Sequence, residues 1–218
     1  MLFDLDGTIV DSARDLVESV LFALRRADGR EPPDADTILM EVGKPLEVIL
    51  RELGYPHGEP EARCFAVSYR KHFSEHHADS SRLYPGMEQT LELLAEAGAR
   101  LAVVTTKQQE QAEMVVAQLG IADRFGYVRG WQEGRRHKPD PEPFLDACAA
   151  LGVAPASALV VGDTEQDVIA AKTGGMASVA VTWGFRPVAM LHALRPDFIV
   201  SRPTDIVPIV VDLPLARQ

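Results

Sequence analysis

Two aspartates near the start of the chain, Asp4 and Asp6, have the spacing of a catalytic or metal-binding pair. Side chains two positions apart on a strand point to the same face, so both carboxylates would converge if the strand ends near Asp4. Gly7 follows and permits a tight turn, because glycine tolerates positive φ. Paired carboxylates there suit a divalent cation, or a nucleophile with its proton donor. A short strand with an ordinary Asp-Gly turn is the alternative, and the motif alone leaves both interpretations open.

Three short apolar runs, at residues 101–104, 158–161 and 178–181, predict buried parallel strands. Polar residues follow each of them, including Thr105 after the first and Asp163 after the second. Ligands of parallel α/β sheets bind at the carboxyl ends of the strands, so these residues could join the two aspartates.

Each of these polar residues also has a purely structural explanation. Thr105 could be an ordinary β-branched strand residue. Lys138, in the segment of residues 137–141, is a further candidate near a strand end and could be a solvated loop lysine. Asp163 could be a helix N-cap, and Asp167 a first-turn acid favoured by the helix dipole. Their joint occurrence at the predicted strand ends favours a common site.

Helical patterns alternate with these strands, at residues 89–97, 108–119 and 141–151, each followed by or ending at a glycine stop. This alternation predicts a parallel α/β sheet. The stretch 12–82 breaks it, with two long helical patterns and no clear strand. We therefore predict a core of residues 1–11 and 83–218, interrupted by a helical insert of residues 12–82. A last strand is expected at 196–200, and prolines make the tail after it hard to assign.

The charge balance is acidic, with 22 lysines and arginines against 32 aspartates and glutamates and a net charge of −10. This argues against a nucleic-acid partner, because such surfaces need clustered basic residues. An anionic substrate would need local cations or a metal ion. Cys64 and Cys148 are far apart, which predicts no disulfide framework. Without a membrane-length apolar run or a signal peptide, we expect a cytoplasmic protein with no membrane partner.

Together the motifs resemble those of the haloacid dehalogenase superfamily over almost the whole chain. The resemblance implies a Rossmann-like doubly wound parallel sheet with an inserted all-helical cap domain. Further short segments are typical of phosphoglycolate phosphatases and a related pyrophosphatase group. The four superfamily motifs correspond to residues 4–8, Thr105, Lys138 with Pro139, and residues 162–167, and the subgroup segments are residues 83–86, 104–107 and 138–143.

The resemblance also implies roles for five residues. Asp4 would attack phosphorus and form an aspartyl-phosphate, and Asp6 would protonate the leaving group and then activate water. Thr105 would donate a hydrogen bond to the phosphoryl group, and Lys138 would supply a positive charge to Asp4 and the phosphate. Mg²⁺ would be held by the Asp4 side chain, the Asp6 backbone carbonyl and the Asp163 side chain.

Other residues have supporting or less specific roles. Asp167 would hold the metal's surroundings or Lys138 in place, and Gly7 and Thr106 would line the phosphate site. Lys44 lies in a Gly-Lys-Pro segment where this cap class carries its specificity loop, so it either meets the substrate or is an exposed loop lysine.

Several side chains are weaker candidates, and one feature departs from the family pattern. His72 and His76 could bind a transition metal, although a solvated helix face is the favoured interpretation. Arg135 and Arg136 could guide anions or be plain surface charge. Only three residues precede Asp4, which predicts a weakly anchored first strand.

The sequence favours a Mg²⁺-dependent phosphatase acting on a small phosphorylated metabolite, with 2-phosphoglycolate as the leading substrate. Inorganic pyrophosphate is the nearest rival, and a sugar-phosphate mutase shares the same core and cap. A dehalogenase is disfavoured by Asp6, and a receiver domain by the helical insert. A phosphate-binding module without turnover is the alternative from another functional class. The expected oligomeric state is a monomer or a dimer.

Overall fold

The computed structural model describes residues 1–27, 32–44, 46–53, 59–77 and 79–212. The chain divides into two compact units. The core unit comprises residues 1–11 and 83–218, and the helical unit comprises residues 12–82.

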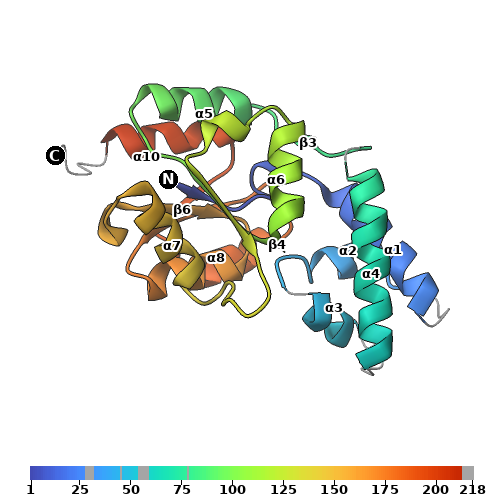
Figure 1. The fold of residues 1–218 in the computed structure, drawn as a ribbon. Coiled ribbons are helices and arrows are strands. Elements are labelled where there is room, and N and C mark those ends of the chain that lie inside the picture. The colour runs from blue at the N-terminus through green and yellow to red at the C-terminus, as the bar shows by residue number, and fades with distance from the viewer. Residues whose placement is uncertain (28–31, 45, 54–58, 78, 213–218) are drawn as a thin grey trace. The chain divides into compact units, whose positions relative to one another are not determined.

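The core unit is built around a six-stranded sheet in the order β5-β4-β1-β6-β7-β8 (Figure 1). Each neighbouring pair of strands runs parallel. The valine, leucine and alanine runs are buried, as expected for parallel strands with helices on both faces. The predicted parallel α/β sheet is confirmed. The strands are β1 (Leu2–Phe3), β4 (Ala102–Gln108), β5 (Tyr127–Trp131), β6 (Leu159–Gly162), β7 (Ala177–Val181) and β8 (Phe198–Val200).

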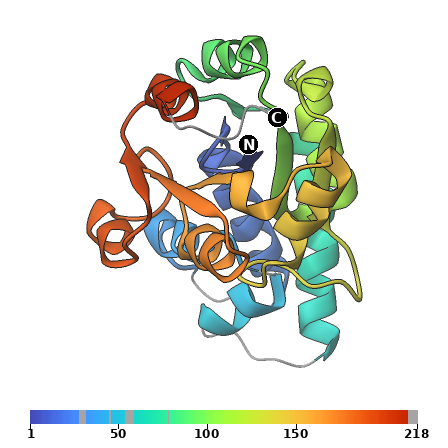
Figure 2. The same cartoon turned by 90° about the vertical axis from the view of Figure 1, so that its left-hand side faces the viewer.

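Helices cover both faces of this sheet. They are α5 (Met87–Glu96), α6 (Gln109–Gln118), α7 (Glu142–Leu151), α8 (Glu165–Thr173), α9 (Val188–Ala193) and α10 (Ile206–Asp212). The chain runs from β1 outward to β4 and β5, and then returns to β6, β7 and β8 beyond β1. Because crossovers are right-handed, this reversal puts α5 and α6 on one face and α7 and α8 on the other (Figure 1). Figure 2 shows α10 beside α5, which it contacts.

Local sequence signals explain where several of these helices begin and end. Helix α7 follows Pro141 and ends at Gly152, whose φ of 63° is the left-handed conformation that favours glycine. The helices predicted at residues 89–97, 108–119 and 141–151 agree with α5, α6 and α7 to within two residues at each end. The tail, which the sequence left unassigned, forms α10 with Pro208 inside it. Pro208 is the third residue of the helix, where proline is tolerated since the first-turn N–H groups have no helical partner.

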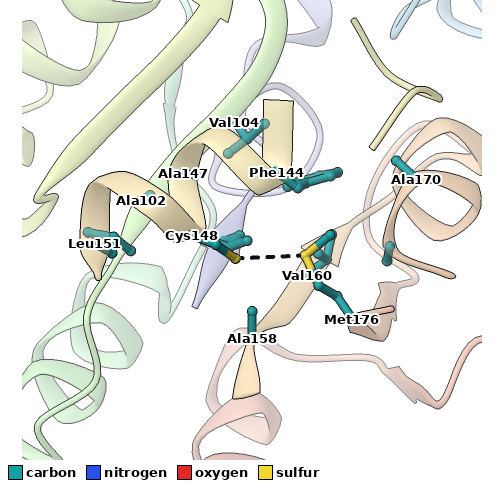
Figure 3. Packing of buried hydrophobic residues seen from close by; sticks show 12 residues of the cluster. Ala102, Val104, Phe144, Ala147, Cys148, Leu151, Ala158, Val160, Ala170 and Met176 are labelled. Atoms are coloured by element: carbon teal, nitrogen blue, oxygen red, sulfur yellow. Dashed lines mark hydrogen bonds between the residues drawn. The ribbon is translucent and has the colours of Figure 1, made fainter. Parts of the chain in front are cut away.

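The face beneath α7 and α8 holds a continuous apolar core (Figure 3). Leu2 from β1 packs there with Phe144 of α7, and the Cys148 thiol lies 4.0 Å from the sulfur of Met176. Both cysteines are free, as predicted. The weak anchoring expected for β1 is wrong, because its two residues are fully buried and pair with β4 and β6 on either side.

The helical unit contains α1 (Ala13–Ala27), α2 (Ala35–Leu39), α3 (Leu46–Glu52) and α4 (Glu59–His76). Helices α1 and α4 pack along each other. Buried Phe65, Tyr69 and Phe73 line one side of α4 at four-residue spacing, with neighbouring rings about parallel. Two short strands, β2 (Val10–Asp11) and β3 (Arg82–Leu83), pair where the chain leaves and re-enters the core unit. Among the described residues, no helix is both long and apolar enough to span a membrane.

Candidate active site

The predicted site residues of the core unit gather around the carboxyl end of β1. Asp4 directly follows β1, and its backbone N–H donates to the carbonyl of Val161 in β6 at 2.9 Å. Asp163 directly follows β6, the neighbouring strand on one side. Thr105 lies in β4, the neighbour on the other side, because this strand extends beyond the predicted run to Gln108. The sheet thus brings together three residues that lie up to 159 positions apart in the sequence.

Lys138 is buried between two carboxylates. Its Nζ atom lies 2.7 Å from Oδ1 of Asp4 and 2.6 Å from Oδ1 of Asp167, and only 2 % of its side chain is exposed. Burial lowers the pKa of Lys138, but the charges of Asp167 and Asp4 outweigh it and hold the pKa above its ordinary value. The alternative of a solvated loop lysine is therefore wrong, and Lys138 stays a cation beside Asp4.

Asp167 connects Lys138 to the start of α8. Its Oδ2 atom accepts hydrogen bonds from the backbone N–H and the hydroxyl of Thr164, at 3.1 and 2.7 Å. Thr164 is the N-cap residue of α8, so the alternative of Asp163 as the cap is wrong. The Thr-x-x-Asp spacing is a capping box, a signal readable in the sequence. Because the box fixes Asp167, it also fixes the carboxylate that holds Lys138.

Asp163 is held by groups from two separate loops. Its Oδ1 atom accepts from the Thr8 hydroxyl at 2.9 Å, and its Oδ2 atom accepts from the Phe185 backbone N–H at 2.8 Å. Gly7 lies against it with a φ of 81°, and a Cβ atom there would stand 2.5 Å from Asp163 Oδ2. The turn after β1 therefore requires glycine for both its conformation and the close approach.

The side chains of Asp4, Asp163 and Asp167 form a cluster that could hold a metal ion. All three are buried, and one carboxylate oxygen from each lies within 4.8 Å of the others. Burial, with the nearby charge of Asp167, raises the pKa of Asp163 to about 7. Burial also raises the pKa of Asp4, although Lys138 opposes the shift. A divalent cation would offset this crowded negative charge, and oxygen ligands are those that Mg²⁺ and Ca²⁺ prefer, so the residues fit such an ion.

Asp6 makes a different contact from Asp4. Its Oδ2 atom lies 3.1 Å from the ammonium of Lys107, and both side chains are almost fully buried. The backbone N–H of Lys107 donates to the Thr105 hydroxyl oxygen at 3.1 Å, which leaves the hydroxyl hydrogen to be donated elsewhere. Lys107 was not among the residues predicted to act at the site. Its position two residues after Thr105 in an extended segment, on the same face, was the available signal.

The remaining predicted candidates have no described contact with the carboxylate cluster, and three of them form ion pairs with other residues. Thr106 is half-buried in β4. Lys44 belongs to the helical unit, where its Nζ atom lies 2.5 Å from Glu41, and its contact with a substrate stays a prediction. Arg135 and Arg136 form ion pairs with Asp146 and Asp140 respectively.

The two histidines of α4 also have neighbours of their own. His76 lies 2.9 Å from a carboxylate oxygen of Asp79, and a ring nitrogen of His72 lies 3.0 Å from the Ser19 hydroxyl. Within the described residues, the carboxylate cluster at β1 is the group whose ligand atoms meet as they would around a metal ion. These contacts favour the interpretation of the histidines as part of the helix surface.

This chain is similar to known proteins over most of its length. Residues 1–181 match the family model of haloacid dehalogenase-like hydrolases. A phosphoglycolate phosphatase from Neisseria meningitidis is 35 % identical over 91 % of this chain and 88 % of its own. A Clostridium perfringens protein named "Putative pyrophosphatase PpaX" is 32 % identical over 98 % and 97 % of the two chains.

Solved structures support the same assignment. A haloacid dehalogenase-like hydrolase from Streptococcus pneumoniae superposes with a TM-score of 0.86 at 28 % identity, covering 95 % of this chain and 96 % of the other. The family match over residues 1–181 and the two relatives above 30 % identity confirm the resemblance inferred from the sequence. The chain belongs to the haloacid dehalogenase-like hydrolase family.

Proposed function

We propose that the protein is a Mg²⁺-dependent phosphatase that hydrolyses small phosphate monoesters through an aspartyl-phosphate on Asp4. The observation that carries this proposal is the buried group at the end of β1. Lys138 contacts Asp4 and Asp167 at 2.7 and 2.6 Å, and Asp163 shares a cluster with these two carboxylates, with one oxygen of each within 4.8 Å of the others. Catalysis of phosphoryl transfer needs positioning and neutralisation of negative charge, which such a group supplies.

Each step is assigned to residues of the core unit. Asp4 attacks phosphorus, while Lys138 keeps its carboxylate oriented and offsets charge on the phosphoryl oxygens. Thr105 donates its hydroxyl hydrogen to a phosphoryl oxygen, since its oxygen already accepts from Lys107. Asp6 gives a proton to the leaving oxygen, and then takes one from the water that hydrolyses the aspartyl-phosphate.

The metal-binding part of the proposal uses the carboxylate cluster together with the turn after β1. Asp4 and Asp163 would hold Mg²⁺ with their side chains and Asp6 with its backbone carbonyl, and Asp167 would hold Lys138 and complete the surroundings. When bound, the ion would reduce the repulsion between the Asp4 carboxylate and an anionic phosphoryl group. Gly7 would leave room for the Asp163 carboxylate, and Thr106 would border the phosphate.

The preferred substrate in this proposal is 2-phosphoglycolate, because the Neisseria meningitidis relative is named a phosphoglycolate phosphatase. Inorganic pyrophosphate is the second candidate, because the Clostridium perfringens relative is named for that activity. Both molecules carry a second anionic group close to the bond that is broken. A cytoplasmic location and a monomeric or dimeric state complete the proposal.

The direct test is phosphate release from a panel of metabolites, with and without Mg²⁺. The panel includes 2-phosphoglycolate, pyrophosphate and hexose monophosphates, and isomerised sugar phosphates are assayed as well to detect a mutase. We expect Mg²⁺-dependent release that is abolished in the Asp4→Asn variant. A folded wild-type protein that binds phosphate esters without turnover would instead support the non-catalytic module.

A further inference from the structure

Two buried lysines occupy different parts of the site. Lys138 contacts Asp4 and Asp167, at 2.7 and 2.6 Å. Lys107 contacts Asp6, with 3.1 Å between Nζ and Oδ2. The first lysine has a place in the proposed mechanism beside the nucleophile, and the second has none. This difference raises the question of what Lys107 does.

Burial makes a purely structural role a poor explanation of Lys107. Only 3 % of its side chain and 9 % of the Asp6 side chain are exposed. Removing an ammonium and a carboxylate from water carries a desolvation penalty that their mutual attraction often fails to recover. Replacing such a pair by apolar side chains of similar volume often leaves stability unchanged or raises it. A lysine at the end of β4, two residues after Thr105, therefore points to a task at the site.

The geometry of phosphoryl transfer indicates which part of a substrate Lys107 faces. The attacking and leaving oxygens lie roughly in line on opposite sides of phosphorus. Asp4 stands on the attacking side, and Asp6, as the proton donor to the leaving oxygen, stands on the leaving side. An ammonium 3.1 Å from the Asp6 carboxylate is therefore also on the leaving-group side. The hydrogen bond from its backbone to Thr105 fixes Lys107 next to the phosphoryl position.

We propose that Lys107 is a specificity-determining residue that binds an anionic group, a carboxylate or a phosphate, carried by the leaving group close to the ester oxygen. The proposal rests on the proposed phosphatase function and on the role given there to Asp6. It assigns the selection of substrates partly to the core unit. The anion and the Asp6 carboxylate would then share one ammonium, which has three donors to offer.

Three phosphate compounds test this proposal. 2-Phosphoglycolate has a leaving group with a carboxylate, pyrophosphate has one with a phosphate, and 2-hydroxyethyl phosphate has a neutral leaving group of the same length as glycolate. The measured quantity is kcat/KM for each anionic substrate divided by kcat/KM for 2-hydroxyethyl phosphate. Lys107→Met removes the charge, and Lys107→Arg keeps it. Lys172→Met is the control, because this lysine of α8 donates to the Leu194 carbonyl on the surface of the same unit.

We expect Lys107→Met to lower all activities, because Asp6 loses its ion-pair partner, but to lower the ratio for the preferred anionic substrate about tenfold or more. Lys107→Arg should restore most of that ratio, and Lys172→Met should leave it at the wild-type value. The substrate whose ratio falls identifies the anion as a carboxylate or a phosphate. Equal losses on all three compounds would overturn the proposal, because Lys107 would then act only through Asp6 or through the fold.

A second readout covers the case in which Lys107→Met folds poorly. Glycolate or phosphate is titrated as a competitive inhibitor of 2-hydroxyethyl phosphate hydrolysis in the wild type and in the Lys107→Arg and Lys107→Gln variants. The proposal requires the inhibitor to bind more weakly to Lys107→Gln than to Lys107→Arg, and equal inhibition constants would refute it. A wild type that hydrolyses 2-hydroxyethyl phosphate as well as both anionic substrates would refute the inference alone. A wild type that releases phosphate from none of them would refute the proposed function.

Discussion

The ion pairs at the carboxyl end of β1 in the core unit are far more deeply buried than the ion pair of Arg14 and Glu18 in the helical unit. In the core unit, Lys138 is buried with Asp4 and Asp167 at contact distances below 3 Å. In the helical unit, the ion pair of Arg14 and Glu18 is exposed at the surface. Buried charges carry a large desolvation penalty, whereas exposed pairs contribute little either way. The core unit therefore places its most heavily desolvated charges at the proposed active site.

The helical unit follows the ordinary pattern of a stable helical fold. Its buried side chains are largely apolar or aromatic, as on the inner side of α4, and its described ion pairs lie mostly at the surface. The rate of phosphate release should therefore fall steeply when single buried charged residues of the core unit are replaced, and only weakly when charged residues of the helical unit are replaced. The following predictions test this contrast, beginning with the largest expected effect.

Asp4→Asn should abolish phosphate release while the protein stays folded. An amide cannot act as the nucleophile that forms the acyl-phosphate, and it also removes one of three crowded negative charges. Turnover of an aryl phosphate and the thermal unfolding midpoint are measured on the same preparation. Substantial residual activity in a well-folded variant would contradict the assignment of Asp4.

Asp6→Asn should lower turnover by roughly 10²–10⁴-fold, the usual contribution of general acid–base catalysis. The proposed metal ligand at this position is the backbone carbonyl, so the Mg²⁺ concentration for half-maximal activity should stay near the wild-type value. Esters with good leaving groups should lose less activity than alkyl esters, because they need less protonation. Equal losses across leaving groups would show that Asp6 is not the proton donor.

Asp163→Ala should raise the Mg²⁺ concentration needed for activity, and excess Mg²⁺ should restore part of the rate. The change removes one of the clustered carboxylates and also the acceptor for Thr8 and Phe185. Asp197→Ala is the matched control, since Asp197 accepts two hydrogen bonds from Ser178 elsewhere in the core unit. If the two variants showed the same Mg²⁺ dependence, Asp163 would have a structural role only.

The sequence allowed most of the core unit to be predicted, because its signals are local. Apolar runs indicated β4, β6 and β7, and glycines indicated the ends of α5, α6 and α7. Strand β5 was not predicted, because its sequence Tyr-Val-Arg-Gly-Trp places a buried arginine and a glycine where an apolar run is expected. Helix α10 was obscured by Pro208, whose place in the first turn only the structure reveals.

The sequence predicted which residues form most of the candidate site, but it predicted fewer of the contacts between their side chains. Parallel strands place Asp4, Thr105 and Asp163 together whatever the details of packing. The ion pair between Asp6 and Lys107 depends on side-chain directions at the end of β4, where the pairing with β5 shifts register. No local pattern encodes that shift, so Lys107 was not predicted as a site residue although it lies in the segment 104–107 that is typical of the subgroup.

Asp15→Ala should destabilise the helical unit without removing the chemical step. Asp15 is a buried carboxylate of this unit, and its Oδ2 atom accepts from the backbone N–H groups of Ser80 and Ser81 and from the Ser81 hydroxyl. Leaving these donors without a partner should cost about 1–3 kcal/mol. Urea unfolding measures the loss, and Arg14→Ala in the neighbouring exposed pair should leave the midpoint unchanged. A large midpoint shift from Arg14→Ala would break the contrast between the two units.

Lys44→Ala tests whether the helical unit contributes a charge to the substrate, and it should have the smallest effect. Lys44 is already paired with Glu41 at 2.5 Å, so a substrate carboxylate would have to compete with that carboxylate. We expect kcat/KM for 2-phosphoglycolate to fall about tenfold relative to an aryl phosphate. This loss corresponds to the lower end of the free energy that a hydrogen bond to a charged group contributes. Glu41→Gln is the companion variant, because it removes the competing charge and should raise the same ratio. Equal losses on both substrates would make Lys44 a structural residue of its loop. No loss at all would leave the recognition of the leaving group to Lys107 in the core unit.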